Sequence, residues 1–282
     1  MSNFWQRVLT GIVFVIVLIG AVLWNKYSFI ALCFIICVLS VHEYAALFKN
    51  RIHKPNFWAT IIGGTCLATV WSVINAVEIT SSARQTDLNI IIVLSILSPI
   101  VVELFPASKF SIINVLLSMI GIIYISLGVG CFESIGSLGV CDGPNPNAPY
   151  DAKLIIGFLL LLWSSDTFAY LTGRAFGKTP LAIKISPKKT WEGSFGGAAC
   201  TIIISFILYK TLGCINLYQW IGLGLIIVVF GTIGDLAESR FKRFLGIKDS
   251  GNILPGHGGM LDRFDSLLCA APVAFAFLVI TS

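Results

Sequence analysis

Most side chains that could do chemistry lie in three stretches of the sequence between residues 163 and 265. They read "WSSDTFAYLTGRAFGKTP" (163–180), "ISPKKTWEGSFGG" (185–197) and "GDLAESRFKR" (234–243), the last followed by "KDSGNILPGHGGMLDRFD" (248–265). Only 12% of the 282 residues are charged, so this crowding needs a reason. Carboxylates beside lysines and arginines can bind a divalent cation together with phosphate groups.

The first stretch places Asp166, Tyr170 and Arg174 at helical spacing, so they share one face. An aspartate inside a membrane-spanning helix costs about 2.5–3.5 kcal/mol and by default marks a functional interior site. The alternative is a stabilising pair with Arg174 near the interface. A nucleotide-binding P-loop is rejected, because the Gly173 to Gly177-Lys178-Thr179 spacing is one residue short and an apolar helix precedes it.

The second stretch contains two adjacent lysines, Lys188 and Lys189, after a proline that excludes helix before it. We expect both to project into an aqueous loop, where ammonium groups suit a polyphosphate. A lysine pair beside the cytoplasmic end of a span is also what the positive-inside rule predicts, so this motif alone does not decide between the two.

The third stretch predicts carboxylates on two helices. Asp235, Glu238 and Lys242 form a polar stripe that also includes Ser239, and Asp262 and Asp265 are three residues apart. A solvated helix face is the simpler explanation of such a stripe. Oxygen ligands on two helices at one membrane face favour a hard cation such as Mg²⁺, which takes one or two carboxylates plus phosphates and waters.

Between these helices lies a glycine-rich turn around His257. Its glycines permit positive φ angles and close backbone approach, so the turn could fold tightly over a ligand. His257 could act as a general base, as a hydrogen-bond donor to phosphate, or as a structural hydrogen-bonding group. The carboxylates are the stronger candidates for the centre of the chemistry.

The elements that must position these residues are transmembrane helices. The chain is 56% hydrophobic with a mean hydropathy of +0.89, and each span needs about 20 apolar residues. We predict an all-α polytopic integral membrane protein with about nine spans and the active site at the cytoplasmic face. The predicted spans are 8–24, 27–48, 57–76, 88–105, 110–131, 154–173, 194–213, 216–234 and 262–281. The first is expected to be a retained span rather than a cleaved signal peptide.

The distribution of positive charge predicts the orientation. Fifteen lysines and arginines fall on the side that holds the N-terminus and the even-numbered loops, against four on the other side. The positive-inside rule therefore assigns that side to the cytoplasm. We expect residues 1–150 (N-terminal transmembrane helices) and 151–282 (C-terminal transmembrane catalytic region) to form one continuous membrane domain.

The eight cysteines show no metal-binding spacing. Cys131 and Cys141 flank the long outward loop and could form a disulfide. A net charge of +5 on the inner membrane face favours membrane lipids with anionic headgroups or phosphates as partners. There is no basic domain of the kind that binds nucleic acid, so no nucleic-acid partner is expected.

The third stretch resembles the signature of the phosphatidate cytidylyltransferase (CDP-diacylglycerol synthase) family. The resemblance rests on Ser239-x-Phe-Lys-Arg, Lys248-Asp-x-Gly and Leu254-Pro-x-His-Gly-Gly-Met-x-Asp-Arg-Phe-Asp, with Ser186-Pro-Lys-Lys-Thr-Trp-Glu-Gly upstream. It implies Mg²⁺-dependent conversion of CTP and phosphatidate into CDP-diacylglycerol and pyrophosphate in phospholipid biosynthesis. It also implies a homodimer in the bacterial cytoplasmic membrane and leaves open a second cation.

The resemblance, together with the charged stretches described above, predicts a role for each site residue. The expected metal ligands are Asp235, Asp262 and Asp265. The expected substrate-binding residues are Lys188, Lys189, Ser186, Arg174 and Arg263. The expected catalytic residues are Asp235, Lys242, Arg243, Lys248, Asp249, His257 and Asp265.

Two other functions remain open at this point. Another CTP-dependent lipid enzyme, such as a polyprenol kinase, would share a basic site at the membrane face. A transporter of an anionic phosphorylated solute would place ionisable residues near the membrane midplane, commonly with repeats, whereas here they lie at one face of one half. These features favour the enzyme over the transporter.

Overall fold

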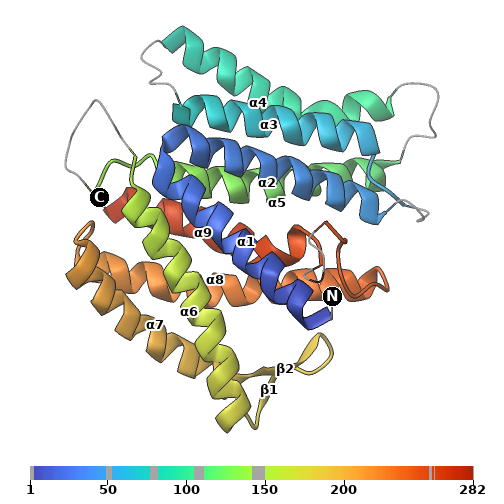
Figure 1. Ribbon diagram of the computed structural model, residues 1–282. Coiled ribbons are helices and arrows are strands. Elements are labelled where there is room, and N and C mark those ends of the chain that lie inside the picture. The colour runs from blue at the N-terminus through green and yellow to red at the C-terminus, as the bar shows by residue number, and fades with distance from the viewer. Residues whose placement is uncertain are drawn as a thin grey trace. The chain divides into compact units, whose positions relative to one another are not determined.

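The structure, a computed structural model, describes residues 3–48, 53–76, 82–104, 111–141, 150–253, 256 and 258–281. Within these residues the chain is almost entirely helical, with one short β-hairpin. The helices are α1 (Asn3–Trp24), α2 (Lys26–Leu47), α3 (Phe57–Ala76), α4 (Ser82–Glu103), α5 (Ile112–Ile135), α6 (Ala152–Phe176), α7 (Trp191–Leu212), α8 (Leu217–Phe244) and α9 (Leu261–Thr281). Each predicted span coincides with one of them, which confirms the all-α prediction (Figure 1).

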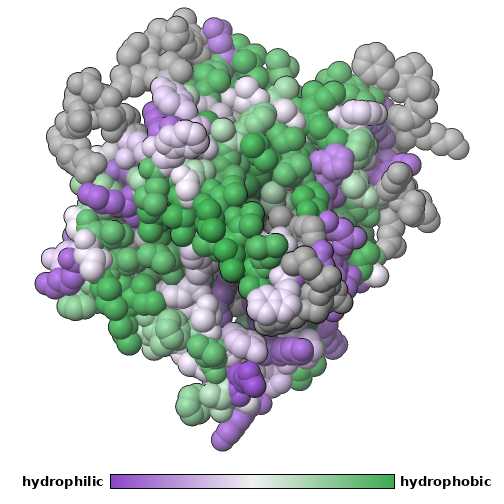
Figure 2. Space-filling model, in the orientation of Figure 1, coloured by the Kyte–Doolittle hydropathy of each residue, from purple (hydrophilic) through white to green (hydrophobic). Residues whose placement is uncertain are grey.

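Eight of the described helices are long and apolar enough to cross a membrane. The predicted span 88–105 lies on α4, and its crossing of the membrane stays a prediction. Large hydrophobic side chains are exposed along the helices, for example Ile16 at 64% and Ile203 at 60%. On the face drawn in Figure 2, hydrophobic side chains form broad continuous areas. Such a surface suits lipid rather than water, and the chain is an integral membrane protein.

The chain forms two compact units. Unit 1 comprises Met1–Glu133 and Asp249–Phe264, and unit 2 comprises Ser134–Lys248 and Asp265–Ser282. The boundary therefore crosses α9, whose first turn belongs to unit 1. The prediction that residues 1–150 and 151–282 form one continuous membrane domain stays a prediction.

In unit 1, α2, α3 and α4 lie side by side (Figure 1). Small residues allow this close packing: Gly64 of α3 lies against Val41 of α2, and Gly63 against Ser95 of α4. The helix interfaces in membranes are enriched in such residues, because without a hydrophobic driving force close backbone approach provides the attraction. A further tie comes from Tyr44, whose hydroxyl donates to the Leu117 carbonyl at 2.8 Å.

In unit 2, α6, α7 and α8 pack together, and the hairpin connects α6 to α7 (Figure 1). Strand β1 (Pro180–Ala182) pairs antiparallel with β2 (Ser186–Thr190). Lys188 and Lys189, expected to project into an aqueous loop, lie on β2 in the connection between two predicted spans, and this strand was not predicted from the sequence. The cause is pairing with β1, a contact that the apolar pattern does not encode.

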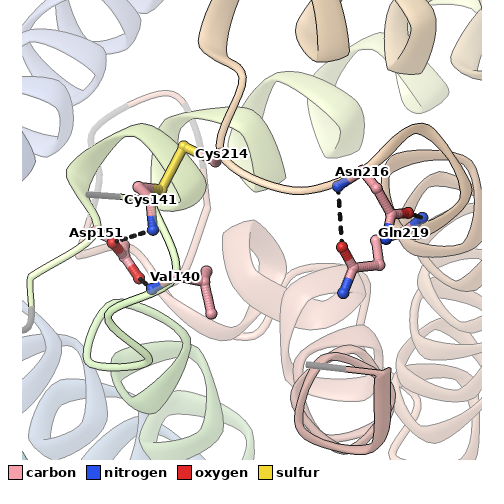
Figure 3. Close-up of a disulfide and its surroundings, with 6 residues drawn as sticks. All are labelled: Val140, Cys141, Asp151, Cys214, Asn216 and Gln219. Atoms are coloured by element: carbon pink, nitrogen blue, oxygen red, sulfur yellow. Dashed lines mark hydrogen bonds between the residues drawn. A yellow bond between two sulfur atoms is a disulfide. The ribbon is translucent and has the colours of Figure 1, made fainter. Parts of the chain in front are cut away.

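Among the residues that the structure describes, a disulfide joins Cys141 to Cys214 in unit 2 (Figure 3). The predicted partner of Cys141 was wrong: Cys131 lies buried in α5 with a free thiol. Asp151 holds the Cys141 loop, since its carboxylate accepts from the Val140 and Cys141 amides at 2.7 and 3.0 Å. Cys214 precedes α8, whose Asn216 cap forms a reciprocal capping box with Gln219.

Candidate functional site

Most charged residues of unit 2 gather at the end of the helices opposite the disulfide. Cys141 and Cys214 lie just before the starts of α6 and α8, whereas the hairpin follows the end of α6. Asp235 is eighteen residues beyond the first residue of α8, about 27 Å along the axis at 1.5 Å per residue. That length is close to the thickness of a bilayer core, about 30 Å. The two ends of unit 2 therefore suit opposite membrane faces.

An ion pair between Lys189 of β2 and Asp235 of α8 forms the centre of this charged end. Both side chains are about 30% exposed, with 29% for Lys189 and 32% for Asp235. Asp235 also accepts a hydrogen bond from the Ser239 hydroxyl at 3.2 Å, one helical turn further along α8. The pair thus links the hairpin to a helix 46 positions away in the sequence.

Two further aspartates lie close enough for their charges to act on this pair. Asp166 of α6 interacts electrostatically with Lys189, Asp235 and Asp265. Asp265 of α9 interacts with Asp235 and Lys242, and its carboxyl group lies within hydrogen-bonding distance of Glu238. Lys242 in turn donates to Glu238 at 3.4 Å. The predicted polar stripe on α8 is thus confirmed, and it faces acidic residues from two other helices.

The hairpin is anchored at its base by Glu192, in the first turn of α7. Its carboxylate accepts from the backbone amides of Lys178 and Thr179 at 3.1 Å, and the Trp191 amide donates to the Thr179 carbonyl at 3.0 Å. Thr190 caps α7 by accepting from the Gly193 amide. These contacts attach both ends of the hairpin to helix termini. The backbone that carries the lysines of β2 is therefore held in place at its ends.

Unit 1 holds Asp262, at the start of α9. Its Oδ2 atom accepts from the amides of Ser250 and Gly259, both at 2.8 Å. The predicted tight turn is also present: Gly256 and Gly258 have φ angles of +78° and +84°. A Cβ on Gly258 would lie 2.7 Å from Asp262 Oδ2, so this position requires glycine for both its conformation and its space.

The remaining predicted residues divide by exposure. Arg174, Lys188, Arg243, Lys248, Asp249 and Arg263 are exposed, and Ser186 is half-buried at the start of β2. His257 lies outside the described residues. The roles of these side chains stay predictions.

Two acidic residues that received no metal, substrate or catalytic role from the sequence find their partners in the structure. Asp166 joins the charged end of unit 2, and Glu43 of α2 lies buried in unit 1, at 4% exposure, against the turn before α9. The sequence signal for both was an acidic side chain inside a hydrophobic segment, which is costly and so rarely kept without a role. No pattern in the sequence indicated which residues they meet.

The donor chemistry of these carboxylates fits a hard cation. Mg²⁺ prefers oxygen ligands and needs only one or two carboxylates when phosphates and waters complete its shell. Within the part of the chain that the structure describes, no group of three or more His, Cys, Asp or Glu is assembled to hold a metal ion.

Comparison with known proteins agrees with this chemistry. Residues 5–281 match the model of a family described as the cytidylyltransferase family. Phosphatidate cytidylyltransferase of Staphylococcus epidermidis is 36% identical over 175 residues, which cover 62% of this chain and 63% of that protein. Its namesake in Staphylococcus aureus is 38% identical over 173 residues, covering 61% and 62%. The matched region thus spans less than two thirds of these relatives.

Proposed function

Because this chain belongs to the cytidylyltransferase family, we propose that it transfers a cytidylyl group from CTP to phosphatidate, forming CDP-diacylglycerol and releasing pyrophosphate. The similar staphylococcal proteins are named for this activity. The structural observation that carries the proposal is the ion pair between Lys189 and Asp235. It joins a cation suited to phosphate with a carboxylate suited to a metal ion, at one end of a membrane-spanning unit.

The reaction needs little from the protein in the way of proton transfer. A phosphate oxygen of phosphatidate attacks the α-phosphorus of CTP, the bond to the β-phosphate oxygen breaks, and pyrophosphate leaves. A phosphate monoester is already anionic near neutral pH, with a second pKa of about 6, so no strong general base is required. The main requirement is to neutralise charge on the α-phosphate and on the departing pyrophosphate.

Lysine and arginine side chains of the charged segments can neutralise this phosphate charge. We assign Lys188 and Lys189 of the hairpin to the phosphates of CTP, with Ser186 and Arg174 beside them. Lys242, Arg243, Lys248 and Arg263 would divide between the nucleotide and the lipid phosphate. Lysine suits dispersed charge, whereas arginine suits two oxygens of one phosphate.

A divalent cation, bound with CTP, would supply further charge neutralisation at the phosphates. We assign Asp235, Asp262 and Asp265 to hold it, with Asp249 supporting them and Mg²⁺ as the ion. Carboxylate oxygen is the donor that this ion prefers. Because the reaction needs no strong general base, we assign His257 to donate a hydrogen bond to a phosphate oxygen rather than to act as a base.

We further propose that the charged end of unit 2 faces the cytoplasm of a bacterial cell, in its cytoplasmic membrane. The disulfide between Cys141 and Cys214 supports this orientation, because it lies at the other end of unit 2 and disulfides persist in oxidising compartments. CTP is then available from the cytosol and phosphatidate from the inner leaflet. The family resemblance also suggests a homodimer.

The decisive experiment uses purified protein in lipid nanodiscs with phosphatidate, Mg²⁺ and CTP labelled at either the α- or the γ-phosphate. We expect α-label in the lipid, and γ-label in pyrophosphate only when phosphatidate is present. Diacylglycerol in place of phosphatidate is the control. Transfer of γ-label to a lipid alcohol would identify a kinase instead, and no lipid labelling from either CTP would overturn the proposal.

A further inference from the structure

Glu43 is a buried acidic side chain that the proposed chemistry does not use. It lies near the end of α2 and is 4% exposed. A carboxylate in such a place is costly unless hydrogen bonds satisfy its oxygens. Its contacts therefore indicate why it is there.

Both oxygens of Glu43 accept hydrogen bonds from the segment that leads into α9. The Ser250 hydroxyl donates to Oε1, and the Met260 amide donates to Oε2 at 2.6 Å. The Leu261 amide lies 3.4 Å from the same oxygen. The segment is thus held at both of its ends by a side chain more than 200 residues earlier in the sequence.

Two of these donors are amides at the start of α9. The first four amides of a helix have no partner within the helix, and a negative charge near them is favourable. Helices usually solve this with a capping residue from the preceding turn. Here the carboxylate of Glu43 serves α9 from another helix of the same unit, so α2 fixes where α9 begins.

Ser250 connects this contact to Asp262. Its hydroxyl donates to Glu43, while its amide donates to Asp262 Oδ2. Gly259 lies at the same junction: its amide donates to Asp262, and a Cβ there would collide with Glu43 and with Ser250. The backbone of this segment is therefore confined between the two carboxylates.

We propose that Glu43 is a positioning residue for Asp262: by binding Ser250 and the first amides of α9, it fixes the orientation in which Asp262 meets the cation. The proposal rests on the proposed function, in which Asp262 is a metal ligand. Residues that orient a metal ligand typically change metal affinity or activity by about 10–100-fold when they are removed.

The test compares Glu43→Leu with Glu43→Gln. Leucine has a similar size but accepts no hydrogen bond, so we expect kcat to fall, or the half-saturating Mg²⁺ concentration to rise, by about 10–100-fold. Glutamine can accept from the Met260 amide through its carbonyl and donate to Ser250 through its amide group. It should stay within about fivefold of wild type, the difference between a charged and a neutral hydrogen bond.

Glu133→Leu is the matched control. Glu133 is also a buried glutamate of unit 1, and it accepts from Asn75 and Ser72 rather than from the segment before α9. We expect Glu133→Leu to lower the stability of the protein without changing the half-saturating concentrations of Mg²⁺ or CTP. If Glu133→Leu and Glu43→Leu change these constants equally, Glu43 acts only through stability and the proposal is wrong.

Hydrogen exchange gives a readout that does not depend on activity. In Glu43→Leu, amides in 249–264 should exchange faster, while the rest of unit 1 stays as in wild type. Ser250→Ala should show the same pattern more weakly, and it carries the test if Glu43→Leu does not fold. Unchanged exchange in both variants would overturn the proposal. An inactive wild type with this exchange pattern would instead refute only the proposed function.

Discussion

Lys189 of the hairpin and Asp235 of α8 form an ion pair, so the residue best suited to phosphate and the residue best suited to a cation neutralise each other directly. A metal–nucleotide complex carries both charges that could replace this contact: a cation for Asp235 and phosphate oxygens for Lys189. The pair therefore brings a candidate phosphate-binding lysine and a candidate metal-binding carboxylate into direct contact.

Replacing Lys189 tests the phosphate half of this pair. We expect Lys189→Ala to lower kcat/KM for CTP by about 100-fold, the usual cost of removing one group that stabilises developing charge. Steady-state release of pyrophosphate measures the loss. Lys184→Ala is the control, because Lys184 is an exposed lysine in the turn of the same hairpin and has no assigned role. Equal losses in both variants would mean that only the net charge of the hairpin matters.

Replacing Asp262 tests the metal half. In Asp262→Asn, the side-chain carbonyl can still accept from the Ser250 and Gly259 amides, so the turn should keep its structure while the negative charge is lost. We expect a folded protein whose activity falls about 100-fold or more at any Mg²⁺ concentration. Thermal unfolding in detergent checks the fold. Near-normal turnover would remove Asp262 from the metal site.

Removing divalent cations should abolish the activity. Because the assigned donors are all carboxylate oxygens, we expect EDTA to stop the reaction, and Mg²⁺ or Mn²⁺ to restore it more fully than Zn²⁺, which favours nitrogen and sulfur ligands. Titration of each metal into EDTA-treated protein measures this. Full turnover in excess EDTA would exclude the assigned role of Asp235, Asp262 and Asp265.

Breaking the disulfide should affect stability far more than chemistry. Cys141 and Cys214 are 73 residues apart, and a disulfide typically stabilises a protein by about 2–4 kcal/mol, with more expected for a long loop. We expect Cys141→Ser to lower the melting temperature, with turnover per folded molecule close to wild type, since the bond lies at the opposite end of unit 2 from Lys189. Melting curves and activity assays on the same sample separate the two effects.

The same cysteines report the orientation. After mild reduction, a membrane-impermeant thiol reagent added outside intact spheroplasts should label Cys141 and Cys214. A single cysteine placed at Lys184, in a variant that lacks the other thiols, should be labelled only after lysis. Labelling of the Lys184 position from outside would reverse the predicted topology.

The sequence by itself determined the helices and several local features of the charged segments. Spans such as 57–76 and 262–281 could be predicted because a bilayer imposes a length and an apolar composition on each helix separately. The stripe of Asp235 and Lys242 followed from helical spacing, which is a local property. In the same way, the turn around Gly258 followed from the conformations that only glycine adopts easily.

Only the tertiary structure decided which distant residues meet. Cys141 pairs with Cys214 rather than Cys131, Lys189 lies on a strand against Asp235, and Glu43 caps a helix that begins more than 200 residues later. None of these pairs leaves a periodic or local pattern, because each depends on how whole helices pack. Side-chain type and spacing therefore indicate what the residues can do, whereas packing determines which of them act together.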